Sequence, residues 1–301
     1  MGKKLLWILV IAVLVLAAGW LVYRHLARVA PPPPPAVASQ WPASTPPPPA
    51  ISNTPSTHPS TPPPTAESKN EKAAASAEPA FVLRPGETLE YDANVATLNT
   101  TVARLKISAV EKRNNAAKSA WHLQAVAHTE NPYRMVFELD DQFDSYSEAA
   151  NMTSVQYEMH LSERGQKVDT VQRMLTSMQE PLPASGSGVR VPPGTRDPIG
   201  MLEYLRGVDW SHTPEVRSPV FDGRKLYDVR NKFLGKANGI KVPAGTYNTN
   251  KIEIRVLDNG QEMKDAHFLL YLTTDPARLP VLMEAVLPVA TARVELTKAK
   301  E

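Results

Sequence analysis

Prolines are concentrated in one stretch of this 301-residue chain, and that stretch decides which part can fold. Fifteen of the 29 prolines lie between Pro31 and Pro64, with unbroken runs at Pro31–Pro35 and Pro46–Pro49. Proline fixes the backbone φ angle and has no amide donor, so such a segment favours extended polyproline II structure over a packed core. The sequence therefore predicts a Pro-rich disordered linker at residues 30–80 and a folded domain at residues 81–301.

The segment before the linker, residues 1–29, is predicted to be an N-terminal transmembrane anchor. Nineteen residues from Leu5 to Tyr23 carry no charge, and as a helix they would be about 28 Å long, close to the thickness of a bilayer core. The alternative is a cleavable signal peptide, whose apolar region is shorter, about 7–15 residues. The run is long enough to favour the uncleaved anchor.

The charges beside this apolar run give its expected orientation. Two lysines precede the run and two arginines follow it, so the positive-inside rule gives the N-terminus a slight preference for the cytoplasm. We expect a single-pass protein of the bacterial inner membrane, held there through residues 5–23, with its C-terminal domain in the periplasm. A cytoplasmic domain is the alternative.

Beyond Pro85, apolar and polar residues alternate with a period of two, which is typical of strands that have one buried and one wet face. Such strands belong to antiparallel sheets. The predicted buried faces consist of Leu105 and Ile107; Tyr133, Met135, Phe137 and Leu139; Val155, Tyr157, Met159 and Leu161; Ile252, Ile254 and Val256; and Val294 and Leu296.

Turn residues separate these strands, and one helix is predicted among them. Arg164-Gly165, Asp222-Gly223 and Asn259-Gly260 are hairpin signals, whereas Pro183–Pro193 resembles a mobile loop. Asp197 is placed to cap a helix that begins at Pro198. The prediction is a mainly β domain: a strongly curved antiparallel sheet or incomplete β-barrel of roughly ten strands, with one short helix over an open end or a face.

Several short segments of the chain have an order and spacing that match a known family. They include Gly86-Glu87, Asp197-Pro198-Ile199, Val220-Phe221-Asp222-Gly223, Pro243-Ala244-Gly245 and Leu272-Thr273-Thr274-Asp275. Across most of residues 81–297 the chain resembles the domain of unknown function 3108 family of exported bacterial proteins. The resemblance implies export and a β-rich, barrel-like domain. It implies no activity.

Metal-ligating and nucleophilic side chains form no convincing motif. The chain has no cysteine, which excludes disulfides, thiolate nucleophiles and Cys-ligated zinc. His122 and His128 lie on one face of a predicted strand but about 20 Å apart, too far to share a metal. Three further histidines have no carboxylate at ligand spacing in the sequence: His160, His212 and His267.

Acidic residues follow the predicted strand that ends at Leu139. Asp140, Asp141 and Asp144 lack the regular spacing and turn glycine of a calcium loop, so turn capping by Asp is the favoured interpretation. Ser185-Gly186-Ser187-Gly188 lacks the pattern of a nucleophile elbow and is interpreted as flexible loop.

Two pairs of charged residues are candidates either for a ligand site or for a structural motif. Asp275 can accept the backbone donors of a turn, with Arg278 paired to it. Asp197 and Arg206 suit the N- and C-terminal ends of the predicted helix. In both pairs the structural interpretation is favoured over ligand binding.

The leading functional hypothesis is a non-catalytic envelope domain that binds an apolar ligand or an envelope protein, without cofactor or metal. Tyr157 and Ile254, with Val155, Met159, Ile252 and Val256, would line its inner face. The alternative, that these side chains simply fill the core, is favoured. The ligand version requires a cavity of about 300 Å³ or more. Nucleic acid is not expected, because the net charge is only +2 and no basic stripe with aromatics is present.

Two other hypotheses belong to different classes. A tethered structural or assembly module would have a filled core and an exposed apolar patch or strand edge. An enzyme acting on envelope polysaccharide would need two carboxylates about 5–9.5 Å apart in a cleft. For that enzyme the sequence offers Asp141, Asp144 and Asp275.

Overall fold

A computed structural model describes residues 83–95, 100–115, 118–176, 187–286 and 291–300. The predicted anchor and linker lie outside these ranges, and no helix within them is long and apolar enough to cross a membrane. The strands are β1 (Thr88–Val95), β2 (Thr101–Asn115), β3 (Lys118–Thr129), β4 (Asp140–Glu148), β5 (Ser154–Glu163), β6 (Gln166–Leu175), β7 (Ser187–Arg190), β8 (Glu215–Phe221), β9 (Leu226–Val242), β10 (Gly245–Asp258), β11 (Gln261–Thr273), β12 (Pro280–Val286) and β13 (Thr291–Lys300).

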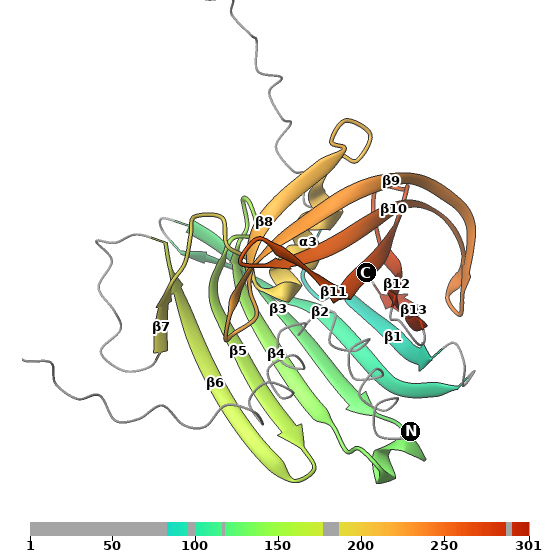
Figure 1. Cartoon of the computed structure of the whole chain (residues 1–301), viewed down its shortest axis with the longest axis horizontal. Coiled ribbons are helices and arrows are strands. Elements are labelled where there is room, and N and C mark those ends of the chain that lie inside the picture. The colour runs from blue at the N-terminus through green and yellow to red at the C-terminus, as the bar shows by residue number, and fades with distance from the viewer. Residues whose placement is uncertain (1–82, 96–99, 116–117, 177–186, 287–290, 301) are drawn as a thin grey trace, which may run out of the picture. The chain divides into compact units, whose positions relative to one another are not determined.

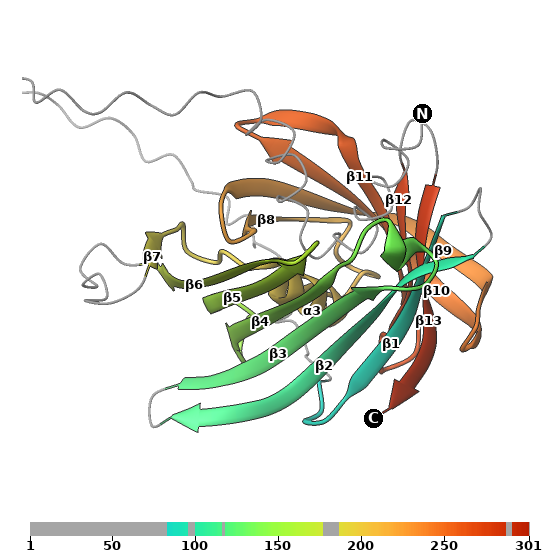
Figure 2. The ribbon, with the colours of Figure 1, turned by 90° about the horizontal axis from the view of Figure 1, so that it is seen from below.

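These strands form one sheet in the order β7-β6-β5-β4-β3-β2-β1-β13-β12-β11-β10-β9-β8. Every neighbouring pair is antiparallel except β6 and β7, which are parallel. The sheet bends so that β2–β6 form one wall and β8–β11 the other, as Figures 1 and 2 show. The prediction of a mainly β, strongly curved sheet is confirmed, with thirteen strands instead of roughly ten.

The sheet stays open, because the edge strands β7 and β8 do not pair with each other in the part of the chain that the structure describes. Residues 195–197 cross between the two walls at one point. The Ser154 amide of β5 donates to the Thr195 carbonyl, and Arg196 forms a parallel bridge with Val220 of β8. An incomplete barrel is therefore the correct description.

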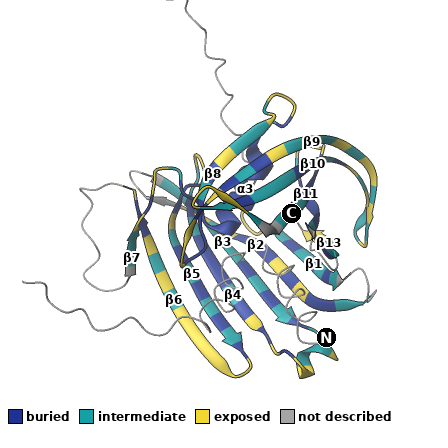
Figure 3. Ribbon diagram, viewed as in Figure 1, coloured by how far each residue is buried: buried dark blue, intermediate teal, exposed yellow. Residues whose placement is uncertain are grey.

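Helix α3 (Pro198–Gly207) lies inside the bend, and nine of its ten residues are buried (Figure 3). A helix so enclosed fills the concave side of the sheet. Gly200 permits its close approach to β4 and β5, since a Cβ there would lie 2.8 Å from Ser147 Oγ and 2.9 Å from Ser154 Oγ. A larger residue would push the helix away from that wall.

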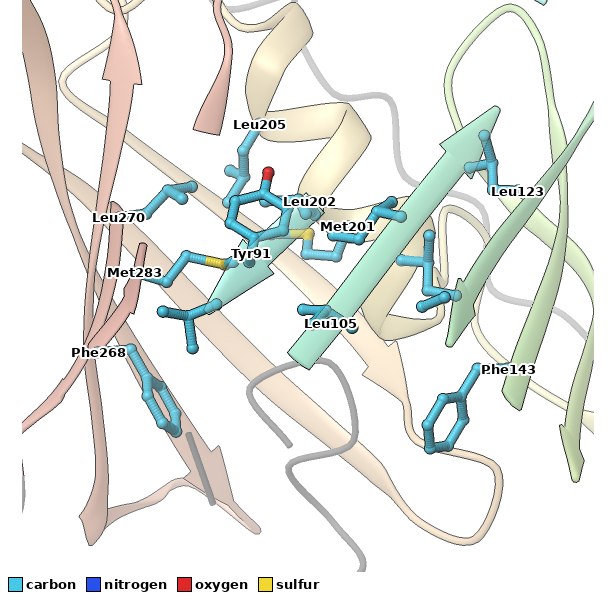
Figure 4. Close-up of a cluster of buried hydrophobic side chains, with 14 of the residues drawn as sticks. Tyr91, Leu105, Leu123, Phe143, Met201, Leu202, Leu205, Phe268, Leu270 and Met283 are labelled. Atoms are coloured by element: carbon cyan, nitrogen blue, oxygen red, sulfur yellow. The ribbon is translucent and has the colours of Figure 1, made fainter. Parts of the chain in front are cut away.

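The hydrophobic core lies between α3 and the two walls. Figure 4 shows side chains from α3 facing side chains from both walls across the interior. Each of these is buried, which by area is the main stabilisation of the fold. The labelled members are Tyr91, Leu105, Leu123, Phe143, Met201, Leu202, Leu205, Phe268, Leu270 and Met283.

The predicted hairpin turns are confirmed by their backbone angles. Arg164 and Gly165, between β5 and β6, have φ angles of 49° and 77°, and Asn259 and Gly260, between β10 and β11, have 48° and 79°. Positive φ at both central residues matches the twist of the flanking strands. Gly223, between β8 and β9, has a φ of 92°.

The strand predicted at residues 133–139 is wrong. Tyr133–Met135 form a 3₁₀ helix, η1, and β4 begins only at Asp140. Pro132 directly precedes this helix and has no amide to donate to a ladder, while the Arg134 guanidinium donates to Glu138 and Asp140. Met135 is consequently 86% exposed.

Val155 does not share the buried face of Tyr157, contrary to the prediction. Ser147 pairs with Ser154 and Tyr146 with Gln156, so Val155 is the extra residue of a β-bulge. A bulge shifts the alternation by one residue, which leaves Val155 37% exposed. A periodic pattern cannot reveal a bulge that lies at the start of its strand.

The loop predicted at Pro183–Pro193 is wrong for part of its length. Ser187–Arg190 form β7, which pairs in parallel with Gln172–Leu175 of β6. Gly186 and Gly188 suggested a mobile loop, but Val189 and Arg190 continue as extended backbone at the sheet edge. Residues 177–186 lie outside the described ranges.

Candidate functional site

The N-terminal end of α3 is held by a buried carboxylate. Asp197 Oδ1 accepts the amides of Ile199 and Gly200, both at 2.9 Å. Its Oδ2 accepts the hydroxyls of Ser145 at 2.6 Å and Ser154 at 2.5 Å. Burial raises the pKa of Asp197, opposed by these four donors. The geometry is that of a helix cap, as the structural interpretation of Asp197 expects.

The C-terminal end of α3 is held by a buried ion cluster. Arg206 donates to Glu87 at 2.6 Å and to Glu203 at 2.8 Å, and all three side chains are almost inaccessible. Burial raises the pKa of Glu203, and the neighbouring Arg206 opposes that shift. Arg206 thus joins the helix to the segment before β1, a role beyond the expected interaction with the helix dipole.

Asp275 and Arg278 occupy the turn between β11 and β12 and serve two different contacts. Asp275 Oδ1 accepts the Thr273 hydroxyl at 3.0 Å and the Ala277 amide at 2.9 Å. The Arg278 guanidinium does not reach Asp275 but donates to the last carbonyls of α3, at Gly207 (2.8 Å) and Val208 (3.2 Å). This turn therefore caps the helix, and the expected pairing of the two side chains is wrong.

An apolar crevice lies between α3 and strands β8–β12. Its volume is about 70 Å³, well below the range of about 300–1,000 Å³ found for ligand pockets. This crevice is therefore smaller than the cavity that the ligand version of the leading hypothesis required. The lining residues are Pro198, Met201, Leu202, Leu205, Val220, Asp222, Tyr227, Val229, Asn231, Ile254, Val256, Phe268, Leu269, Leu270 and Met283.

Two residues that line this crevice each have a buried oxygen with no hydrogen-bond partner among the described residues. Asp222 Oδ1 caps the β8–β9 turn by accepting the amides of Arg224 and Lys225, but its Oδ2 is unpartnered. Asn231 Oδ1 is also unpartnered, while its Nδ2 makes only long contacts of 3.4 and 3.5 Å with carbonyls. Buried acceptors usually find a donor, so both atoms call for explanation.

Asn231 is a residue that the sequence analysis missed. It lies on the same face of β9 as Tyr227, Val229 and Phe233, and it is fully buried. The signal was present, because a polar side chain interrupts an otherwise apolar alternation. Asp222, by contrast, was noted only for its turn.

Tyr157 and Ile254, the two inner-face candidates, lie on opposite walls. Ile254 of β10 lines the crevice. Tyr157 of β5 is fully buried beneath the β8–β9 turn, where a Cβ on Gly223 would lie 3.4 Å from its ring and 2.5 Å from Met159 Cε. Tyr157 is thus part of the contact between the walls and not of the crevice.

The acidic residues near position 140 are not in a turn, as was predicted, but inside β4. Asp141 points to the same side as Phe143 and accepts the Ser162 amide at 2.9 Å. Asp144 points to the opposite face, which we call the outer face of β3–β6. Because the two carboxylates lie on opposite faces and Asp275 caps a remote turn, they form no catalytic pair in one cleft.

Three histidines that lacked a carboxylate partner in the sequence have one in the structure. His160 Nδ1 lies 2.7 Å from Asp169, His212 Nδ1 lies 2.8 Å from Asp209, and His267 Nε2 lies 3.0 Å from Glu253. Asp169 lies on β6, next to the strand of His160, and Glu253 lies on β10, next to the strand of His267. Only the register of the sheet reveals these two partners.

His160 also belongs to a larger cluster. Ligand atoms of Asp144, Glu158 and His160 lie within 4.8 Å of one another on the outer face, a spacing that permits binding of a metal ion. Glu158 and His160 are two residues apart on β5, a spacing that could have drawn attention to them in the sequence.

A family model described as "Protein of unknown function (DUF3108)" matches residues 90–297. The chain belongs to the DUF3108 family. The matched range begins in β1 and ends in β13, so it contains α3, the crevice and the outer-face cluster. The resemblance noted in the sequence is confirmed, and no activity comes with it.

Solved structures similar to this DUF3108 chain include a β-barrel-like DUF1849 protein from Brucella abortus (10% identity, TM-score 0.48, covering 72% of this chain and 97% of that one). A putative exported protein with a YmcC-like fold from Bacteroides fragilis has 9% identity and a TM-score of 0.34 over 74% and 100% of the two chains. A putative lipoprotein from Parabacteroides distasonis has 11% and 0.37 over 74% and 99%. At these scores the similarities carry no functional information, and no curated protein matches the chain.

Proposed function

We propose that this protein is a non-catalytic binding domain of the bacterial cell envelope, tethered to the inner membrane through residues 5–23 and displayed in the periplasm. Its binding site is the crevice beside α3. The occupant is a slim aliphatic chain that ends in a hydrogen-bond donor. The anchor and the long proline-rich segment support the tether, and the unpartnered oxygens of Asp222 and Asn231 support the site.

The size of the crevice limits what can enter it. A water-sized group needs about 10–15 Å³ of such space, so a volume of about 70 Å³ accommodates roughly five atoms in a row. An unbranched chain fits this space, whereas an aromatic ring or a branched lipid does not. The occupant is therefore either a small linear molecule or one projecting chain of a larger partner.

The polar atoms define how the ends of such a chain are recognised. Asp222 follows β8, and Asn231 lies five residues beyond Leu226 on β9, about 16 Å along the strand, so one short chain meets one of the two oxygens. Each of these oxygens is an unpartnered acceptor. A hydroxyl or ammonium group would satisfy either oxygen, and an ammonium would also neutralise Asp222.

Butylamine and butan-1-ol, each with five non-hydrogen atoms, test this proposal on the full chain in lipid nanodiscs, with binding measured by calorimetry. Both should bind saturably, because each carries a linear chain and a donor. Ile254→Trp fills the crevice and should abolish binding. Leu234→Trp is the matched control, since Leu234 is 46% exposed on β9 and outside the crevice.

The variant Asp222→Asn separates charge from shape. It keeps an oxygen for the β8–β9 turn but removes the negative charge, so affinity for butylamine should fall about tenfold, while affinity for butan-1-ol should change little. Absence of binding by both probes, or equal binding by the Ile254→Trp protein, would refute the crevice as the site.

A further inference from the structure

The outer face of β3–β6 carries a group of side chains that the proposed binding domain does not use. Asp144 of β4 pairs directly with Glu158 of β5 across the ladder, and His160 follows Glu158 on the same face. The register therefore gathers two carboxylates and one imidazole at one place. Ligand atoms from the three residues all lie within 4.8 Å of one another.

His160 is held in the orientation that a metal-binding histidine adopts. Its Nδ1 lies 2.7 Å from Asp169 Oδ1 of β6, which leaves Nε2 facing Glu158 Oε2 at 3.4 Å. A histidine that binds a metal generally gives its other ring nitrogen to a carboxylate, which fixes the ring and its tautomer. Asp169 occupies that position.

The distance between Glu158 and His160 fits a particular ion. Two ligand atoms bound to tetrahedral zinc at about 2.0–2.1 Å lie about 3.3 Å apart. The observed separation between Glu158 Oε2 and His160 Nε2 is 3.4 Å. A direct hydrogen bond would be shorter, at about 2.7–2.9 Å for a charged pair.

The two carboxylates are also fixed before any ion binds. Asp144 is nearly inaccessible, and its oxygens contact His122 Nε2 at 2.7 Å, Gln124 at 3.0 Å and Gln142 at 2.7 Å. Gln156 donates to Glu158 Oε1 at 2.6 Å. Each carboxylate oxygen has two lone pairs, so one donor still leaves room for a metal.

His160 is partly exposed and Glu158 less so, which gives an ion access from solvent.

We propose that Asp144, Glu158 and His160 bind one divalent transition-metal ion, zinc by geometry and donor type, on the outer face of β4 and β5. Asp169 positions His160, and water completes the coordination. Two carboxylate oxygens and one imidazole nitrogen form a ligand set that suits zinc. The site is independent of the crevice, because it lies on the opposite face of the sheet.

Another histidine on the same face provides a matched control. His128 of β3 lies 3.1 Å from Glu130 Oε1, and no third ligand belongs to that pair among the described residues. A histidine–carboxylate contact by itself is a surface ion pair of small energy. His128→Ala should therefore leave metal binding unchanged.

Calorimetric titration of the full chain with Zn²⁺, in detergent micelles and after treatment with a chelator, tests the site. One ion per chain is expected. His160→Ala and Glu158→Gln should each lower the affinity more than tenfold, and Asp169→Asn by about tenfold. Thermal unfolding of each metal-free variant shows whether the fold is intact.

Spectroscopy adds a readout that a purely structural role would not change. Co²⁺ in place of zinc should give the intense visible bands of a four-coordinate ion, and His160→Ala should remove them while His128→Ala should not. Titrations without saturable binding, or equal affinities for the His160→Ala and His128→Ala proteins, would overturn the site. Six-coordinate Co²⁺ spectra would overturn the assignment to zinc.

Discussion

Asp141 and Asp144 lie three residues apart on β4, and both are almost fully buried, at 2% and 4% exposure. Their pKa values nevertheless shift in opposite directions. Burial raises the pKa of Asp141 to about 7, with only the Ser162 amide opposing it. Three side chains donate to Asp144 and lower its pKa in spite of burial. The supply of donors, and not burial alone, decides whether a buried carboxyl keeps its charge.

The largest effect is expected from Asp141→Asn. The folded-state pKa of Asp141 lies above its unfolded value, so its favourable contribution to stability is complete below about pH 4 and is lost as the pH rises through about 7. The shift of about three units corresponds to at most about 4 kcal/mol. The amide has no charge to bury, so at pH 8 the variant should be more stable than the wild type.

Denaturant unfolding of both proteins from pH 4 to pH 8, in the same micelles, measures this difference. Other ionisable groups cancel in the comparison, since the two chains differ at one residue. If the difference between the two free energies of unfolding stays constant over this range, burial does not raise the pKa of Asp141.

Asp144→Asn should have the opposite sign and a smaller size. The folded-state pKa of Asp144 is below its unfolded value, so its contribution is present above about pH 4 and is lost as the pH falls through the folded pKa. Loss of charged hydrogen bonds from the surrounding side chains should cost about 2 kcal/mol at pH 7. Unfolding in the presence of a chelator removes any contribution from a bound ion.

Asp141→Asn and Asp144→Asn together test whether the two carboxyls differ, because the first is expected to stabilise the protein at pH 8 and the second to destabilise it at pH 7. Gln142→Leu provides an intermediate case, since it removes one donor to Asp144 and should raise the pKa of that carboxyl. If Asp144→Asn also stabilises the fold at neutral pH, donors on the outer face do not offset the cost of burial.

The sequence could predict the class of fold but not the partners of these two residues. Alternation and turn glycines identified the antiparallel strands, and Asp197-Pro198 located the start of α3. The alternation of apolar and polar residues in Tyr133–Leu139 resembles that of a strand, although Pro132 precedes it. Asp140–Asp144 were therefore predicted to lie in the turn after that strand. That single error hid the fact that Asp141 and Asp144 of β4 lie on opposite faces of the sheet.

The candidate sites were less accessible to sequence analysis for a physical reason. Glu158 and His160 share a strand face, which alternation alone can show, but Asp144 and Asp169 reach them only through the register of β4, β5 and β6. The crevice depends on where α3 lies inside the bend. Pairing across strands and the placement of a helix are long-range properties that local patterns do not contain.

The smallest effect is expected from Asp197→Asn. Asp197 is a third buried carboxyl, and it combines many donors with a raised pKa. Its favourable contribution is therefore complete below about pH 4 and declines as the pH rises through its folded-state value. Asp197→Asn keeps the oxygen that caps Ile199 and Gly200 and should cost about 1 kcal/mol, whereas Asp197→Ala removes the cap and should cost about 2 kcal/mol.

Denaturant unfolding at pH 5 and pH 7 distinguishes capping from charge at this residue. Asp275→Ala is the matched control, because Asp275 caps an exposed turn with the same type of contact and should change stability less. Equal losses for Asp197→Asn and Asp197→Ala would mean that the negative charge, held by the hydroxyls of Ser145 and Ser154, contributes more than the helix cap does. The hydrogen-bond donors around Asp197 would then stabilise its negative charge against the effect of burial, as the donors around Asp144 do.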